Sequence, residues 1–323
     1  MATKGETPKG SKPFFWVSLE KPPRKDKPPD HDRFQDWSGR LEVEIEVVST
    51  YLYVGSGTFE LFPLDGQEQV CYAFARRNGE LVIPGTSVKG AVRNVLEAIS
   101  NSCVRQTDKK EGVHGSHRAC EGVDKLCPAC RLFGTTGYRG RVHFSDAVPV
   151  GEVKTERIKI ADLWPPRLAK GRKFYQAREF QALDKRPEKS HRFLEVVPRR
   201  SRFAASLYFE NASSAEMGLL MRAWGLDVQE SKQESKVVHA FPIKLGGAKP
   251  RCLGAVYLRP KRLYLIQEGP DFFSALRSGG TPASLREKLR VWLEDKSLLD
   301  GKAWETFLRE AKLKHEPCPV EVY

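Results

Sequence analysis

Two segments of the chain alternate apolar and polar residues. Residues 41–47 carry Leu, Val, Ile and Val at every second position with glutamates between them, and residues 203–209 alternate in a similar way. A period of two is typical of a β-strand with one buried face. Both segments are therefore predicted to be strands of a sheet with one side in the core.

Apolar residues at a spacing of three and four predict a helix between these strands. The Pro–Gly pair within residues 83–86 ends the preceding segment of regular structure. Thr86 is expected to cap the helix that follows. Apolar positions from Val88 to Ile99 then lie on one face of a helix over about 86–100. Further helices are predicted over 214–225, 282–296 and 302–313.

The order of the predicted elements indicates the class of fold. Extended segments are also predicted at 141–146, 252–258 and 263–266, so the order through residue 258 is strand, helix, strand, strand, helix, strand. This is the α+β order of a ferredoxin-like or RRM-like domain. We predict a Pro- and Lys-rich arm at 1–38 that orders only against a partner, an RRM-like domain at 39–266 and a helical extension at 267–323.

Positive charge is concentrated in one part of the chain. The net charge is +13 and the sequence pI is near 9.4, and residues 154–202 alone hold 15 basic and six acidic residues. Such a local excess is typical of proteins that bind nucleic acid. Aromatic residues are interleaved with the charges, which favours a protruding RNA-contacting hairpin at about 153–200 over a solvated charged face. The candidate contacts are Lys170, Arg172, Lys173, Arg199 and Arg200.

Four of the seven cysteines have the spacing of metal ligands. Cys127 and Cys130 are two residues apart in a CPAC motif, and Cys103 and Cys120 lie upstream. Thiolates at this spacing converge on one tetrahedral cation, so an insertion at 103–130 is predicted to hold a structural zinc ion with no ligand position left for water. His114 and His117 are alternative ligands, and free thiols are the plainer alternative. The odd number of cysteines fits a reducing compartment better than a set of disulfides.

No stretch of the sequence approaches the roughly 18 consecutive apolar residues that a membrane span requires. We therefore expect a cytoplasmic protein without a membrane partner.

Two further segments combine features of phosphate binding. Residues 83–90 place hydroxyl groups and a lysine at the start of a helix, where backbone N–H groups are free. Residues 244–254 place paired glycines beside positive charges, so that the backbone can approach a ligand closely. A capped helix and a plain turn are the respective alternatives. The candidate residues are Thr86, Ser87 and Lys89 in the first segment, and Gly246, Gly247, Lys249 and Arg251 in the second.

Three segments in this order resemble the RAMP superfamily of CRISPR-associated proteins, in particular its Cas-seven-like backbone subunits of type III effectors. They are IPGTSVKGAVRNVLEAI, CPACRLFGTTGYRGRVHFSDA and KLGGAKPRCLG, and the resemblance covers about residues 40–260. It implies an antiviral ribonucleoprotein in which an RRM-like palm holds guide crRNA, a thumb hairpin at 154–200 displaces one base at regular intervals, and copies of the chain assemble with other CRISPR-associated subunits. Carried over by position, Lys89 and Arg93 would contact guide phosphates, and Gly246, Gly247 and Lys249 would form a Gly-rich loop.

The same resemblance implies a candidate for catalysis. Active relatives cut target RNA with a divalent cation and an Asp in the loop between the first strand and the helix, and Asp65 is the only Asp in that connection. Its carboxylate would hold Mg or Mn, or orient the ribose 2′-OH. The alternative for Asp65 is an Asp–Gly turn, whereas Asp146 is expected to be structural. A non-cleaving scaffold with a separate nuclease, a guide-processing RAMP endoribonuclease and a zinc-containing RNA-binding module outside CRISPR are the rival functions.

Overall fold

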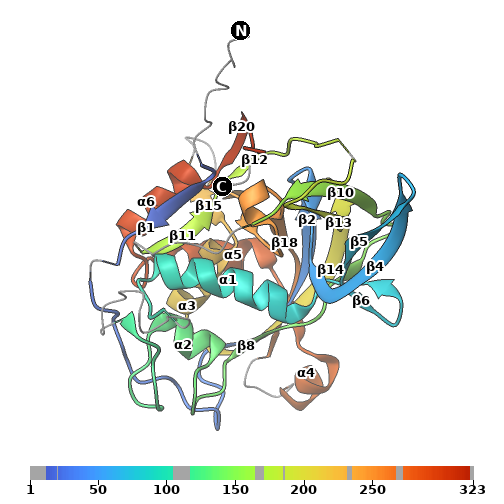
Figure 1. The fold of residues 1–323 in the computed structure, drawn as a ribbon. Helices are drawn as coiled ribbons and strands as arrows, with labels where there is room; N and C mark the ends of the chain where they lie inside the picture. Colours follow the sequence, from blue (N-terminus) through green and yellow to red (C-terminus); the bar gives the residue numbers. More distant parts are fainter. Residues whose placement is uncertain are drawn as a thin grey trace.

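The protein is a mixed α+β structure built on a curled antiparallel sheet. The computed structural model describes residues 12–19, 21–104, 117–163, 171–184, 186–230, 235–266 and 272–320. The main sheet has seven strands, with β9 (Val148–Pro149) pairing β14 and β19 (Thr281–Ala283) pairing β18. Its central path runs β17 (Ile243–Lys244), β18 (Ala255–Ile266), β2 (Trp37–Val47), β14 (Arg202–Ala212) and β8 (Val142–Phe144) (Figure 1).

The alternating segments form the centre of this sheet. Ile45 of β2 is paired with Phe203 of β14 on one side and Leu258 of β18 on the other, antiparallel in both cases. The apolar positions of β2 are buried while its glutamates are partly exposed. The predictions of strands at 41–47 and 203–209 are therefore confirmed, and the segments predicted at 252–258 and 263–266 belong largely to one long strand, β18.

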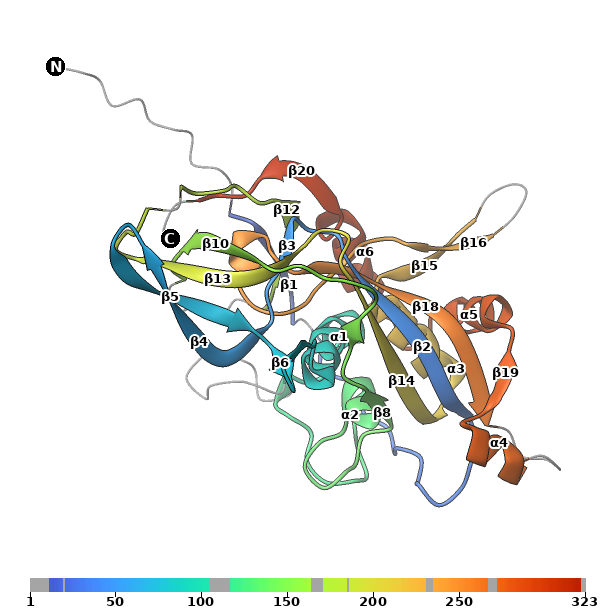
Figure 2. The same ribbon diagram turned by 90° about the vertical axis from the view of Figure 1, so that its right-hand side faces the viewer.

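Helices cover the buried face of the sheet (Figure 2). The helix α1 (Gly85–Ile99) and the helix α3 (Ser214–Ala223), which begins with a capping box between Ser213 and Glu216, both belong to the main core. The C-terminal helices are α5 (Leu285–Glu294) and α6 (Gly301–Glu310). These four helices confirm the predicted ones, whereas α4 (Phe272–Ser278) was not predicted.

The start of α1 differs from the prediction. The N-cap residue is Pro84, whose side chain cannot cap the helix. Thr86 lies inside the first turn of α1 and is not the cap. Instead, the Asp146 carboxylate accepts a hydrogen bond from the Gly85 backbone N–H at 2.8 Å. A residue 61 positions away thus supplies the cap, which local sequence could not indicate, and the structural role expected of Asp146 is observed.

A second sheet forms one end of the molecule. It pairs β10 (Glu156–Ala161), β13 (His191–Pro198), β5 (Gln67–Phe74) and β4 (Gly55–Leu64), with β3 (Tyr51–Leu52) also pairing β13. Two further strands of the basic segment, β11 (Arg172–Tyr175) and β12 (Ala177–Glu179), pair with the chain termini instead. The strands at the two ends of the segment, β10 and β13, pair antiparallel with each other, and apolar residues such as Ile160, Phe174 and Val196 are buried. The thumb hairpin at about 153–200 stays a prediction.

The N-terminal segment is also part of the fold. The strand β1 (Phe14–Val17) pairs antiparallel with β11, and Phe15 and Val17 are buried. Phe15 stacks on Phe174 with ring centroids 5.7 Å apart. The expectation that residues 1–38 order only against a partner is thus wrong for this part, since the Pro- and Lys-rich composition concealed a short apolar strand.

A disulfide bond joins Cys252 to Cys318 and ties the C-terminal segment to the 244–254 loop. The expectation of a reducing compartment in place of a set of disulfides did not anticipate this bond. No helix in the described part of the chain is long and apolar enough to cross a membrane. The remaining short elements are β6 (Arg76–Arg77), β7 (Glu80–Leu81), α2 (Pro128–Phe133), β15 (Leu226–Gln229), β16 (Lys236–His239), a 3-10 turn at Lys249–Arg251 and β20 (Leu313–Pro317).

Candidate metal centre and nucleic-acid interface

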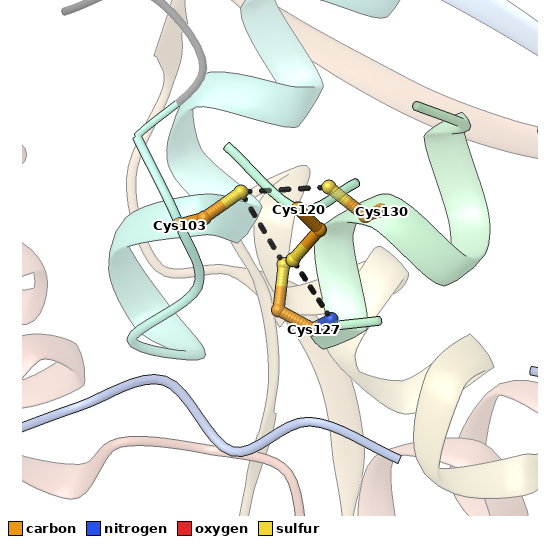
Figure 3. Close-up of side chains that lie close together, drawn as sticks. All are labelled: Cys103, Cys120, Cys127 and Cys130. Carbon is orange, nitrogen blue, oxygen red and sulfur yellow. Dashed lines mark hydrogen bonds between the residues drawn. The ribbon is translucent and has the colours of Figure 1, made fainter. Parts of the chain in front are cut away.

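The four predicted cysteine ligands converge in the core (Figure 3). The Sγ atoms of Cys103, Cys120, Cys127 and Cys130 all lie within 4.8 Å of one another, and all four residues are buried. The Sγ of Cys103 is 3.4 Å from that of Cys130 and 3.6 Å from that of Cys127. A tetrahedron of four thiolates with Zn–S bonds of about 2.3 Å has edges of about 3.8 Å. The cluster therefore fits a tetrahedral structural metal site.

Hydrogen bonds between separate segments hold the cysteines together. Cys127 precedes α2 and Cys130 lies within it, whereas Cys103 follows the end of α1. The Ser102 hydroxyl accepts a hydrogen bond from the Ala129 N–H at 3.1 Å and so joins the two segments. His117 is not one of the clustered groups, and its Nε2 lies 3.3 Å from the Asn101 side-chain oxygen. His114 lies outside the described residues.

The thiols also perturb one another's ionisation. Hydrogen bonding, first of all with Cys103, lowers the pKa of Cys120 to about 7 and lowers the pKa of Cys127 further, whereas the pKa values of Cys103 and Cys130 are raised. Because the thiolate is the form that binds metals, a cluster that is partly ionised near neutral pH is suited to a cation.

Two arginines expected to contact RNA are turned into the core next to this cluster. Arg93 donates from Nε to Glu97 at 2.7 Å, from Nη1 to the Gly134 carbonyl at 2.9 Å and from Nη2 to Cys130 Sγ at 3.5 Å. Arg172 pairs with the other oxygen of Glu97 at 3.3 Å. Both arginines are buried. These positions do not fit the expected phosphate contacts, because the guanidinium groups are covered by protein.

A small pocket lies between α1, β11, β17 and the 244–254 loop. Its volume is about 70 Å³, and its walls include the rings of Phe15, Phe174 and Phe241. Lys173, Lys244 and Lys249 line it, and none of the described residues that line it is acidic. Three cations in a partly apolar pocket without a carboxylate favour an anion as the occupant.

Burial weakens the protonation of these lysines. It lowers the pKa of Lys244 to about 7, with the positive charge of Lys249 as the second cause, and it also lowers the pKa of Lys249 and of Lys173. The Lys244 ammonium donates to the carbonyls of Cys252 and Leu253 at 3.0 and 2.8 Å. A bound anion would favour the charged form of these lysines, above all of Lys244.

The glycines of the 244–254 loop serve packing. Gly246 has a φ of +78°, and a Cβ there would lie 2.0 Å from the Tyr53 carbonyl oxygen. Gly247 donates its N–H to the same carbonyl at 2.8 Å. Arg251 is buried and donates to the carbonyls of Ala161 and Asp162. The loop is thus fixed against its neighbours, and Lys249 is the member of the predicted set that reaches the pocket.

The remaining candidates lie outside the pocket. Thr86 is exposed and Ser87 and Lys89 are partly exposed, in the first turns of α1. Arg199 and Arg200 are exposed at the turn between β13 and β14, where Arg199 pairs with Glu179 at 2.7 Å. Lys170 lies outside the described residues.

Asp65 is a turn residue at the tip of the β4–β5 hairpin. Leu64 pairs with Gln67, and the two residues between them, Asp65 and Gly66, have φ values of 50° and 75°. Positive φ at both positions is the geometry of a type I′ turn, for which Asp–Gly is favoured. The four cysteines are the one group of potential metal ligands found in the described ranges, and Asp65 is not among them.

The sequence reasoning missed two residues that organise these sites. Glu97 follows Arg93 by four positions in α1, a spacing at which helical ion pairs form, and this signal could have predicted their contact. Lys244 lies in a segment singled out for its glycines, but nothing local indicates that its side chain is covered by α1 and the aromatic rings.

The comparison with protein families identifies the chain. The model of the RAMP superfamily matches residues 44–229, from the middle of β2 to the end of β15. The comparison with curated proteins finds no match. Since the family match covers more than half of the chain and includes α1, the cysteine cluster and the basic strands, the chain belongs to the RAMP superfamily.

Proposed function

We propose that this chain is an RNA-binding backbone subunit of a CRISPR effector complex, and that it holds guide crRNA at the pocket beside α1, which we call the groove. Membership of the RAMP superfamily directs the proposal to CRISPR RNA. The observation that carries it is the pocket lined by Lys173, Lys244 and Lys249, with no carboxylate among the described residues of its wall. A phosphodiester supplies the missing negative charge.

The guide would continue from this pocket along α1. Thr86 and Ser87 are accessible at the start of the helix, and Gly90 and Asn94 are exposed further along it. One N–H of the first turn is taken by Asp146, which also pairs with Arg77 at 2.7 Å. The hydroxyl groups and Lys89 are therefore the proposed contacts there, and Arg199 and Arg200 are proposed contacts beyond the groove.

The arrangement of the main sheet supports an RRM-like palm. The strand order β18-β2-β14-β8 is antiparallel throughout, α1 lies between β2 and β8 in the chain, and α3 lies between β14 and β18. Two strand–helix–strand units arranged in this way are the core of a ferredoxin-like fold.

We further propose that zinc occupies the cysteine cluster. Four thiolates are the ligand set of structural zinc sites, and a closed set leaves no position for a reacting water. The ion would join the end of α1 to α2, and so hold the insertion against the palm.

Exposed apolar patches support association with copies of the chain or with related subunits. Phe59 and Tyr72 are cross-strand neighbours on the β4–β5 hairpin and are 60% and 37% exposed, and Phe273 of α4 is 75% exposed. Figure 2 shows the hairpin and α4 at opposite ends of the molecule. Two different patches at opposite ends of the molecule suit head-to-tail stacking. Such stacking extends into a filament instead of closing into a dimer.

Cleavage of target RNA at Asp65 with Mg or Mn stays a prediction, with a separate nuclease as the alternative. Asp65→Asn removes the carboxylate but tolerates the positive φ of the turn, so it is the matched partner of Asp65→Ala. If Asp65 carries the chemistry, both variants lose cleavage by the assembled complex and retain guide binding. Unchanged cleavage in both would assign the cutting to another subunit.

The main test measures binding of a labelled single-stranded oligoribonucleotide to the purified, nucleic-acid-free protein at low salt. Lys249→Glu is expected to weaken binding by at least about tenfold, because it replaces attraction to a phosphate with repulsion. Arg262→Glu, an equal change of charge at an exposed position of β18, is the control and is expected to have a much smaller effect. Equal losses in the two variants, or no binding by the wild-type protein, would overturn the proposal.

A further inference from the structure

We infer that Arg93, Glu97 and Arg172 act as positioning residues for the metal centre, and that this buried triad couples the metal to the RNA groove. The coupling to RNA rests on the proposed RNA binding, whereas the role toward the metal rests only on the proposed zinc site. None of the three side chains would touch RNA, so the inference gives Arg93 and Arg172 a function in place of the phosphate contacts expected from the sequence.

The contacts run without interruption from sulfur to β11. The Arg93 guanidinium donates to Cys130 Sγ at 3.5 Å and to Glu97 at 2.7 Å, and the second oxygen of Glu97 pairs with Arg172 at 3.3 Å. Arg172 also donates to the carbonyl of Ser102, the residue before Cys103. The triad thus reaches the cysteine cluster from both ends, through a side chain at Cys130 and through the backbone at Cys103.

The balance of charge explains why such a triad is needed. Four thiolates around a divalent cation have a net charge of −2, and the side chains of Arg93, Glu97 and Arg172 together contribute +1. Uncompensated charge is costly in a buried site, so nearby guanidinium groups stabilise the metal-bound form. N–H donors to ligating atoms also fix the direction of the ligands, which is the general role of residues behind a metal's own ligands.

The link to the groove follows from the adjacency of residues in β11. Arg172 is buried against Glu97, and the next two residues, Lys173 and Phe174, line the pocket. The helix α1 makes a second connection, because it carries Arg93 and Glu97 and also Ala91, Asn94 and Val95 of the pocket wall. A displacement of the triad would therefore move Lys173 and α1 relative to each other.

The first experiment tests the metal. Full-length protein is loaded with zinc, and transfer of zinc to a colorimetric chelator is followed for Arg93→Gln, Arg172→Gln and Arg222→Gln. Arg222 is a matched control, since it is fully buried and donates to carbonyls of Leu293 and Asp295, remote from the cysteine cluster. Arg93→Gln and Arg172→Gln are expected to release zinc about 10–100 times more readily than the wild type, and Arg222→Gln is expected to match it.

Arg93→Lys keeps the positive charge but loses the planar set of guanidinium N–H donors. This variant is used in place of Arg93→Gln if Arg93→Gln does not fold. The role toward the metal would be overturned if the Arg93 and Arg172 variants released zinc no more readily than the wild type or Arg222→Gln.

The second experiment tests the coupling without RNA. Removing zinc from the wild-type protein is expected to raise hydrogen exchange at the amides of β11 and α1, while β15 and β16 keep their protection. Unchanged protection in β11 would overturn the coupling. Because zinc release and hydrogen exchange do not depend on RNA, a wild-type protein that binds no RNA would refute the proposed function and leave both readouts valid.

Discussion

The two sides of the central sheet both carry many basic residues, but they differ in what faces those residues. On the outer side, the glutamates of β2 pair with cations of the neighbouring strand β18: Glu42 with Arg262 at 2.9 Å, Glu44 with Lys261 at 2.9 Å and Glu46 with Arg259 at 2.6 Å. On the helix side, Lys173, Lys244 and Lys249 share a pocket with no acidic residue among its described lining. What distinguishes a site for a polyanion is therefore the absence of carboxylates beside the positive residues, and not the number of positive residues.

The difference arises from the geometry of each side. The alternation of β2 directs all three glutamates to the same face, and antiparallel pairing places β18 beside them. Such exposed pairs are screened by water and contribute little individually. The groove instead combines β11, β17 and a loop, so that its lysines come from three segments with no shared pattern.

Removing the metal should cause the largest difference between the two sides of the sheet. Chelation of the proposed zinc ion is expected to disorder α2 and the end of α1, because structural zinc contributes directly to folding. The groove would then lose RNA affinity while the outer pairs remain. Hydrogen exchange and RNA binding, measured on the same zinc-free sample, check both parts. Retention of full RNA affinity would break the link between groove and metal centre.

Neutralising the groove should have the next largest effect. The triple change of Lys173, Lys244 and Lys249 to Gln is expected to make the dependence of log affinity on log salt less steep by about 2, since each phosphate contact with a single strand contributes about 0.7. The matched change of Arg259, Lys261 and Arg262 to Gln should leave the slope close to that of the wild type. Titrations at several salt concentrations provide both slopes, and equal slopes in the two variants would remove the distinction between the two sides.

The parts of the fold that the sequence predicted are those set by local periodicity. The strand at 41–47 and the helix at 86–100 were predicted because their alternation and spacing depend on nearby residues alone. The CPAC spacing likewise predicted the cysteine cluster. The cap of α1 by Asp146 could not be predicted, because it depends on contact with a residue far along the chain.

The same limit explains the errors about charge. Arg93 and Arg172 were expected to contact RNA, but both are buried with Glu97. The local excess of cations in 154–202 gave no indication of which of them meet a carboxylate. That depends on tertiary contacts such as the one between Lys159 and Asp184 at 2.8 Å.

A change of pH should have a smaller effect that also separates the two sides. The pKa of Lys244 is lowered to about 7, so raising the pH from 6 to 8 removes most of its charge. RNA affinity is therefore expected to fall by up to about tenfold over this range, if only the charged form binds phosphate. Lys244→Met should show a flatter profile, whereas Arg262→Gln should follow the wild type. An equally steep profile in Lys244→Met would assign the pH dependence to another group.

The same shift has a consequence for stability with the opposite dependence on pH. The pKa of Lys244 is lower in the folded than in the unfolded chain, so the unfolded chain binds the proton more tightly. The cost of burying Lys244 is thus largest below pH 7 and disappears as the pH rises from about 7 toward 10.5. Lys244→Met should stabilise the protein most in acid, which denaturant titrations at pH 6 and 9 can measure.

The smallest effect is expected on the outer side. Glu44→Gln leaves Lys261 and Arg202 without their shared carboxylate, yet both cations are about half exposed. Because water already solvates them, the free energy of unfolding should change by less than about 1 kcal/mol and RNA affinity by less than about twofold. Denaturant titration and RNA binding of this single variant measure both. A large gain in RNA affinity would show that the glutamates of β2 suppress a second polyanion site, and the groove would then no longer be the distinctive side of the sheet.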